Sequence, residues 1–507
     1  MSEAGIVVAA VARPLGRLRS PLAPAIGWLA LLLALSILAR VEIYTRVPTR
    51  LGPDGYSYLN LARQLRGVPT PSGWDGLANM ARDDQAARTP GYPLLLNLTF
   101  LLAGHRPTPT PLLAAFDRQR RFDAWHFNFL ARSENIRAVH LVQHALGISA
   151  TVLAYMTVLR WTRRPWLAAL AAGLAVGLRP TWFYFYEPVI QTEVVAGTLM
   201  LLLVWMTAEL EGRPAIGLGR AALIAAASAA GVLVRPALIF GTLLVVAGIR
   251  TTGRCRGRAL TAAAALWLAV IGAWVVRNGV NYGYWGLSSV VPATLASHLQ
   301  YDRDAFTDPM VGTLCAKECG QPHAGVWILR SMVLDGGLSY LEASSRLGRQ
   351  SIRVILRHPG AYLASVASGF VRFWYPQEIL FPWEGVRTRG IDWIPPSFWT
   401  AYVVLSVLAT AVAGFLIFSV RVPRMAKLAT AMVAVSAVGV SLIVGVPLDN
   451  VRAAFPFAPI LLMASASVVG RVLDRLDGLP RDPSDGEMGQ NQHPGPSRKT
   501  KPHTTSM

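Results

Sequence analysis

The sequence predicts an all-α polytopic membrane protein, a bundle of about 10–12 transmembrane helices. Of its 507 residues, 53% are hydrophobic and only 15% are charged, and the mean hydropathy is +0.40. This composition is too apolar for an ordinary soluble domain of such length. We therefore predict one membrane-embedded domain over residues 1–476 and a polar, disordered cytoplasmic tail over residues 477–507.

The basic charge of the chain follows its membrane topology and does not indicate nucleic-acid binding. The sequence has 48 Lys and Arg against 28 Asp and Glu, a formal net charge of +20. Most of these basic residues lie at the ends of apolar runs, where the positive-inside rule places them. Three arginine clusters, at 160–164, 250–258 and 421–427, therefore mark the cytoplasmic side.

The first apolar run, 22–39, is long enough to span and lacks a small-x-small cleavage site, so we expect a retained anchor. The next apolar piece, 92–103, has about twelve residues, against the roughly twenty that cross the hydrocarbon. It should lie in the interface or re-enter the membrane. Residues 45–136 then form one large external loop with juxtamembrane helices.

Further spans are expected because apolar runs alternate with the arginine clusters. They cover 139–159, 165–185, 188–208, 219–234, 237–248, 259–276, 398–420, 431–446 and 453–469. Residues 277–357 form a second external segment without a span. The piece 361–374 is expected to be a surface or re-entrant helix.

Two of the three cysteines, Cys315 and Cys319, lie in the second external segment, and Cys255 lies in a cytoplasmic arginine cluster. In an oxidising outer compartment, we predict that Cys315 and Cys319 form a disulfide. A metal site is the weaker interpretation, because no CxxC motif or histidine partner completes it. His140 and His144 likewise lack a third ligand in the sequence.

Charged residues at membrane depth are rare and are functional candidates. Under the predicted topology those of this chain gather on the external side. Interfacial arginines also snorkel or bind lipid head groups, which is the structural alternative for each one. The set comprises Asp54, Arg88, Glu187, Glu193, Arg235, Arg277, Asp449 and Arg452.

The stretch "GPDGYSYLNLARQL", residues 52–65, predicts a helix entered through a proline with an acid, Asp54, at its start. Such an acid can cap the helix. It can also act as a base at a wet membrane surface, with Tyr58 four residues later on the same face. In "RTPGYP", two prolines and a glycine fix the backbone beside Arg88, whose guanidinium suits a phosphate. Arg235, Arg277 and Arg452 offer further phosphate contacts.

The order of "PDGYSYLNLARQLRG", "RTPGYPLLL", "EPVIQTEV", "VRP", "WVVRN" and "VRAAFPFAP" resembles the membrane-embedded GT-C glycosyltransferases. The likeness is to the bacterial family 39 group, which is related to dolichyl-phosphate-mannose-protein mannosyltransferases and to the lipid A aminoarabinose transferase. It runs loosely from about residue 22 to 470 and rests on the order of the motifs and their position relative to the spans.

The resemblance implies a catalytic aspartate at Asp54, a nearby tyrosine at Tyr58 and a basic residue at Arg88. Many members carry an acidic pair where this chain has Asp54 followed by Gly55. The candidates for a second carboxylate are Glu187, Asp83 and Asp84. A divalent cation is a candidate cofactor, and no metal ligands are assigned.

The resemblance implies an inverting hexosyl or pentosyl transferase in the cell membrane, acting on its external, periplasmic side. The donor would be a polyprenyl-phosphate-linked sugar and the acceptor a glycan, lipid or protein. Asp54 would deprotonate the acceptor while arginines hold the departing phosphate. The alternatives are a transporter or flippase of an anionic lipid-linked saccharide and a non-catalytic scaffold. Membrane lipids are expected partners, and nucleic acid is not.

Overall fold

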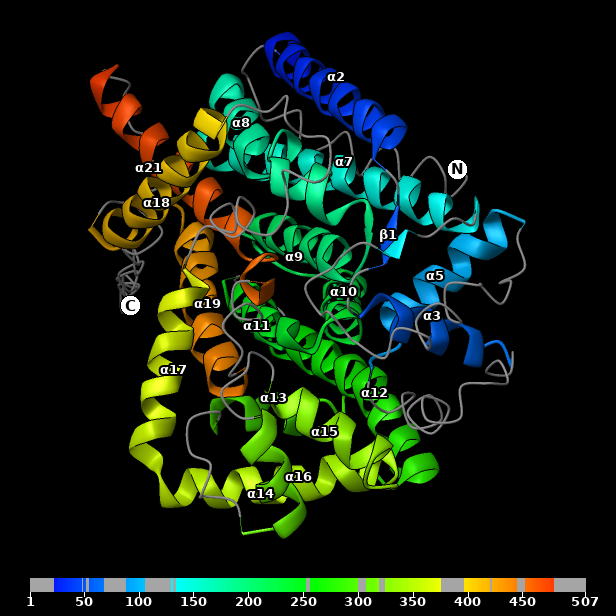
Figure 1. The fold of residues 1–507 in the computed structure, drawn as a ribbon. Helices are drawn as coiled ribbons and strands as arrows, with labels where there is room; N and C mark the ends of the chain where they lie inside the picture. Colours follow the sequence, from blue (N-terminus) through cyan, green and yellow to red (C-terminus); the bar gives the residue numbers. More distant parts are fainter. Residues whose placement is uncertain are drawn as a thin grey trace, which may run out of the picture.

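The computed structural model describes residues 22–47, 49–51, 54–67, 88–104, 129–130, 134–251, 256–299, 307–318, 324–374, 396–419, 422–444 and 452–477. These residues are mostly helical (Figure 1). The predicted tail beyond Asp477 lies outside the described residues. So do Asp83, Asp84, Cys255 and Cys319.

The first half of the fold comprises α2 (Leu22–Arg46), β1 (Arg50–Leu51), α3 (Gly55–Gln64), α5 (Gly91–Leu102), β2 (Phe129–Leu130), α7 (Glu134–Thr162), α8 (Pro165–Ala172), η2 (Gly173–Gly177), η3 (Thr181–Tyr186), β3 (Val189–Ile190) and α9 (Glu193–Ala208). The second half comprises α10 (Leu218–Val234), η4 (Pro236–Gly241), α11 (Thr242–Arg250), α12 (Arg256–Tyr282), α13 (Val291–Ala296), η5 (Ser297–Leu299), α14 (Pro309–Glu318), α15 (Ala324–Leu334), α16 (Tyr340–Arg357), α17 (Pro359–Phe373), α18 (Pro396–Ser419), α19 (Arg424–Ile443) and α21 (Ala458–Leu476).

Several helices have the length and composition of membrane spans. Five of those described qualify by both measures: Ala23–Arg46, Ile136–Thr162, Pro165–Tyr186, Arg256–Tyr282 and Arg424–Ile443. Shorter apolar helical segments include α9, α10 and Thr400–Phe415 within α18, where spans were also predicted. The fold class, an all-α polytopic membrane protein, is confirmed. The short helix expected at 92–103 is α5, with 12 residues.

α9 forms the centre of the bundle, where it packs against α7 and α10 (Figure 1). α2 lies along α7 and α8, and α12 packs against α10. α18, α19 and α21 pack against one another on another side of the bundle. Large apolar side chains on the outer helices remain exposed, among them Leu38 at 64%, Leu268 at 63% and Phe415 at 77%. Exposed apolar surface of this kind suits contact with lipid tails.

The third predicted span is not a regular α-helix. After α8 the chain forms two π-helical segments, η2 and η3, which lie on either side of Leu178, Arg179 and Pro180. Pro180 has no backbone N–H to donate, which accounts for the break at this point. The irregular end of the span leads directly to Glu187 and β3.

The segment 277–357, predicted to be external, contains a group of helices with a hydrophobic core of its own, contributed by α13 to α16. α16 begins at a side-chain cap, because the Ser339 hydroxyl accepts a hydrogen bond from the Glu342 backbone N–H at 3.2 Å. α17 follows after His358 and packs against α19. At 15 residues, α17 is shorter than the roughly twenty needed to span.

Cys315 is fully buried in this second core and is disulfide-bonded. Cys319 lies outside the described residues, so its pairing with Cys315 stays a prediction. We expect peptide mapping without reductant to recover a peptide joining Cys315 to Cys319. The loop it closes is small, so reduction should change local geometry more than global stability. Free thiols at both positions would contradict the pairing.

Candidate active site

A small three-stranded sheet brings two acidic residues to one place. β1 pairs in parallel with β3, with Arg50 opposite Val189 and Leu51 opposite Ile190, and β2 flanks β1 on its other side. Asp54 follows Leu51 by three residues, and Glu193 follows Ile190 by three residues. Because the strands are parallel, both acids leave the sheet at the same end.

Three arginines bind these two carboxylates. Arg88 Nη2 donates to Asp54 Oδ1 at 2.6 Å, and Arg235 Nη1 lies 3.0 Å from Glu193 Oε1. Arg452 Nη2 bridges the two acids, 3.2 Å from Asp54 Oδ2 and 2.8 Å from Glu193 Oε1. We call these five residues the arginine cluster, and its formal charge is +1.

The cluster keeps Asp54 ionised. Burial alone would raise the pKa of this carboxyl group, but the Arg88 and Arg452 guanidiniums outweigh burial and hold the pKa well below its usual range. The Asp54 side chain is about 25% exposed, whereas that of Glu193 is fully buried. Asp54 is therefore the carboxylate of the cluster that solvent and ligands can approach.

Asp54 contributes to the start of α3 through its backbone. Its carbonyl oxygen accepts a hydrogen bond from the Tyr58 N–H at 3.2 Å, while both side-chain oxygens are bonded to arginines. The carboxylate is thus committed to ion pairs, which weakens the helix-capping interpretation of this residue.

Tyr58 lies beneath the Arg88 guanidinium, 5.3 Å from it, and packs edge-on against Tyr92 at 5.2 Å. The Tyr92 hydroxyl donates to Gln143 Oε1 at 3.0 Å, which ties α5 to α7. Burial raises the pKa of Tyr58, so its hydroxyl stays protonated at neutral pH. Tyr58 therefore supports Arg88 and offers a donor close to it.

Close backbone packing explains why Arg88 and Arg235 face the same site. A Cβ built on Gly91 would lie 2.7 Å from the Leu233 carbonyl carbon and from the Val234 nitrogen, so only glycine fits here. The Thr89 hydroxyl also donates to the Val234 carbonyl at 3.4 Å. These contacts fasten the "RTPGYP" motif to the end of α10, immediately before Arg235.

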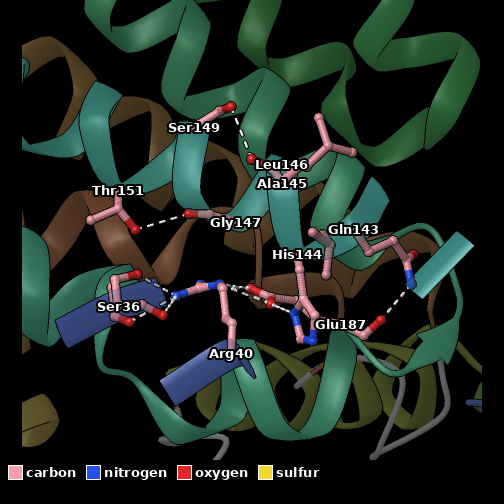
Figure 2. Close-up of polar contacts among 12 residues, drawn as sticks. Ser36, Arg40, Gln143, His144, Ala145, Leu146, Gly147, Ser149, Thr151 and Glu187 are labelled. Atoms are coloured by element: carbon pink, nitrogen blue, oxygen red, sulfur yellow. Dashed lines mark hydrogen bonds and ion pairs between the residues drawn. The ribbon is translucent and has the colours of Figure 1, made fainter. Parts of the chain in front are cut away.

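Glu187, a candidate second carboxylate, lies in a separate buried group (Figure 2). Arg40 donates through Nη2 to Glu187 Oε1 at 2.7 Å and through Nε to Oε2 at 3.0 Å, and His144 Nδ1 also contacts Oε2. The Arg40 and Glu187 side chains are 2% and 0% exposed. Gln143 donates to the Glu187 carbonyl at 2.7 Å. Glu187, at the end of η3, therefore links this end to α2 through Arg40 and to α7 through His144.

Glu193 is the acid that the structure places beside Asp54. The sequence analysis includes it among the charged candidates but does not name it as a second carboxylate. Glu187 and Glu193 both belong to the motif "EPVIQTEV", so their external position could not separate them. A distinguishing signal was the place of Glu193 in the first turn of the apolar helix α9, where an acid is favoured. Asp83 and Asp84 lie outside the described residues.

Arg277 does not bind either acid of the cluster. Its guanidinium lies over the rings of Trp274, at 4.4 Å, and Tyr282, at 4.8 Å. It also donates to Asn278 Oδ1 at 2.9 Å. The structure therefore brings together Arg88, Arg235 and Arg452 among the predicted phosphate-binding residues.

The cluster does not fit a divalent cation. Among the residues that the structure describes, no three His, Cys, Asp or Glu side chains come close enough to hold one. Both acids of the cluster are bonded to guanidinium groups, which a cation would have to displace against charge repulsion. We assign no step to a metal ion.

The other end of α9 carries a second group of charges. Glu209 contacts Arg160 at 3.3 Å and Arg213 at 3.2 Å. Nearby, Arg164 pairs with Asp474 at 3.0 Å. These arginines belong to or adjoin the segments predicted to be cytoplasmic. α9 therefore separates the arginine cluster from an arginine-rich end of the bundle.

A scan against protein-family models finds no match, and a search of curated proteins finds none. Solved structures similar to this chain include two crystal structures of ArnT from Cupriavidus metallidurans, one bound to undecaprenyl phosphate and one in the apo state. Each shares 14% sequence identity and covers 89% of this chain and 79% of the ArnT chain, with TM-scores of 0.33 and 0.34. With likeness this low, we base the function on this chain's own residues.

The packing of Gly91 predicts a specific defect. Gly91→Ala should lower the free energy of unfolding by about 1–3 kcal/mol, because the new methyl group meets backbone that cannot rotate away. The control is Gly272→Ala in α12, where nothing lies within 4 Å of the added Cβ. Thermal unfolding of the purified protein measures the effect, and equal stability of the two variants would contradict the argument.

The geometry of Arg88 predicts a graded series. The sequence predicts that Arg88 binds a phosphate, so Arg88→Ala should weaken binding of a phosphate-bearing lipid about tenfold or more, the usual range for a hydrogen bond to a charged group. Arg88→Lys should recover part of this loss, because lysine keeps the charge but lacks the bidentate fork. Arg277→Ala is the matched control and should bind almost normally, since Arg277 lies over aromatic rings. Unchanged binding in Arg88→Ala would make Arg88 an interfacial anchor.

Proposed function

We propose that this protein is an inverting glycosyltransferase that moves a sugar from a polyprenyl-phosphate donor to an acceptor. The observation that carries the proposal is the ionised Asp54, held by Arg88 and Arg452 at one end of a membrane-embedded bundle. A base and two phosphate-binding groups thus occupy one partly exposed place. The motif order shared with the GT-C glycosyltransferases supports the same class of reaction.

The donor phosphate would bind the guanidiniums that now bind Asp54. A phosphodiester carries one negative charge, which equals the excess charge of the cluster in size and opposes it in sign. Phosphate binding would withdraw Arg88 and Arg452 from Asp54. Because these arginines keep the Asp54 pKa low, their withdrawal would raise it and make the carboxylate a better base.

The chemical step is then balanced in charge. The acceptor hydroxyl or amine attacks the anomeric carbon, its proton passes to Asp54, and the bond from that carbon to the phosphate oxygen breaks. The departing polyprenyl phosphate keeps the electron pair and gains a second negative charge. Protonation of Asp54 removes one negative charge from the cluster at the same moment, so the arginines can stabilise the leaving group.

We place the reaction on the external side of the membrane. The arginine-rich end of the bundle, with Arg160 and Arg164, follows the positive-inside rule and therefore belongs to the cytoplasm. The arginine cluster lies at the opposite end of α9. This orientation suits transfer of a sugar that has already crossed the membrane on its lipid.

Asp54→Asn tests the proposed base. Transfer should fall at least about a hundredfold, the usual lower range for loss of a general base. Binding of undecaprenyl phosphate should stay equal or become tighter, because the variant frees two guanidiniums from a competing carboxylate. The assay uses the full-length protein in lipid, a polyprenyl-phosphate sugar and an envelope acceptor fraction.

The control for this test is Asp308→Asn, which removes another carboxylate paired with an arginine, Arg346, in the second external segment. It should leave transfer nearly unchanged. A transporter would keep flipping in Asp54→Asn, and a scaffold would keep its assembly. Transfer at the wild-type rate in Asp54→Asn would refute the role of Asp54 as base.

A further inference from the structure

The two oxygens of Glu193 have different surroundings. Oε1 accepts from Arg452 Nε at 3.1 Å and Nη2 at 2.8 Å, and it lies 3.0 Å from Arg235 Nη1. Oε2 is buried and has no hydrogen-bond partner, and the side chain as a whole is fully buried. One oxygen therefore carries all the arginine contacts, while the other is an unused acceptor.

An unused acceptor on a buried carboxylate is costly. An ionised oxygen that leaves water without gaining a hydrogen bond loses its solvation without compensation. Most buried polar atoms are paired for this reason, and exceptions call for an explanation. The explanation can be a ligand that supplies the missing donor, as in preformed binding sites.

The chemistry of the donor identifies the ligand group. An ionised phosphodiester has no proton to donate and would be repelled by Glu193 Oε2. The sugar is covalently attached to that phosphate and carries hydroxyl donors. Arg452 Nη2 contacts Glu193 directly, so a sugar whose phosphate is held by Arg452 would lie close to Oε2.

We infer that Glu193 Oε2 accepts a hydrogen bond from a hydroxyl group of the donor sugar, which makes Glu193 a sugar-recognising residue of the site. The inference rests on the proposed function, because it takes the donor phosphate to bind Arg452. Charge favours an uncharged sugar, since one phosphodiester already neutralises the cluster. In this arrangement Asp54 accepts the proton of the acceptor, and Glu193 binds the donor sugar.

The test compares two lipids on the full-length protein. One is undecaprenyl phosphate, and the other is the same lipid carrying a neutral hexose. In Glu193→Gln the amide oxygen should stay on the arginines, which turns the amide N–H₂ toward the sugar and replaces a charged acceptor with a donor. Binding of the hexose-bearing lipid should weaken roughly tenfold to a hundredfold. Binding of undecaprenyl phosphate should stay equal or tighten, because the cluster loses a negative charge.

Glu193→Asp provides a second variant should Glu193→Gln fail to fold. It keeps the charge that balances Arg235 and Arg452 but withdraws the oxygen by one methylene, and the loss should again be confined to the hexose-bearing lipid. The matched control is Glu209→Gln, at the other end of α9, which removes a carboxylate that contacts three arginines. It should bind both lipids as the wild type does.

Equal losses for both lipids would mean that Glu193 only holds the arginines, and this would overturn the inference. Unchanged binding of both lipids would overturn it as well. A wild-type protein that binds neither lipid would instead refute the proposed function. The outcomes therefore separate the two claims.

Discussion

The guanidinium of Arg452 holds the site together, because it lies between the carboxylates of Asp54 and Glu193. Two ionised acids this close would repel each other without a shared cation. Arg452 also joins parts of the chain that are far apart in sequence: the first loop, the start of α9 and the segment before α21. The placement of Asp54 depends on this contact, and so does the geometry that a phosphate would meet.

The membrane dictates where such a group of charges can lie. Ionised side chains are expensive at the centre of the bilayer, so they gather at the ends of spans or pair with one another. α9 illustrates both outcomes, with Glu193 and its arginines at one end and Glu209 with its arginines at the other. The buried pair of Arg40 and Glu187 is the second solution, since each neutralises the other inside the bundle.

The sequence could predict several of the membrane-spanning helices, because they follow from hydropathy and length. It could not predict which acids meet. Glu187 and Glu193 are six residues apart, and a two-residue strand pairing decides that the second lies beside Asp54. Strands this short leave no alternating pattern to detect. Arg277 illustrates a related limit, since hydropathy places it at a span end but does not show that it turns toward Trp274.

The resting arrangement explains how a site at the membrane surface could remain inactive until its donor arrives. An aspartate bound to two guanidiniums is ionised but is a weak base. In the proposed reaction, a donor phosphate would compete for the same guanidiniums and thereby change the electrostatics of Asp54. The two events would be coupled because they share Arg88 and Arg452. The base would gain its strength only when a sugar is present to be transferred.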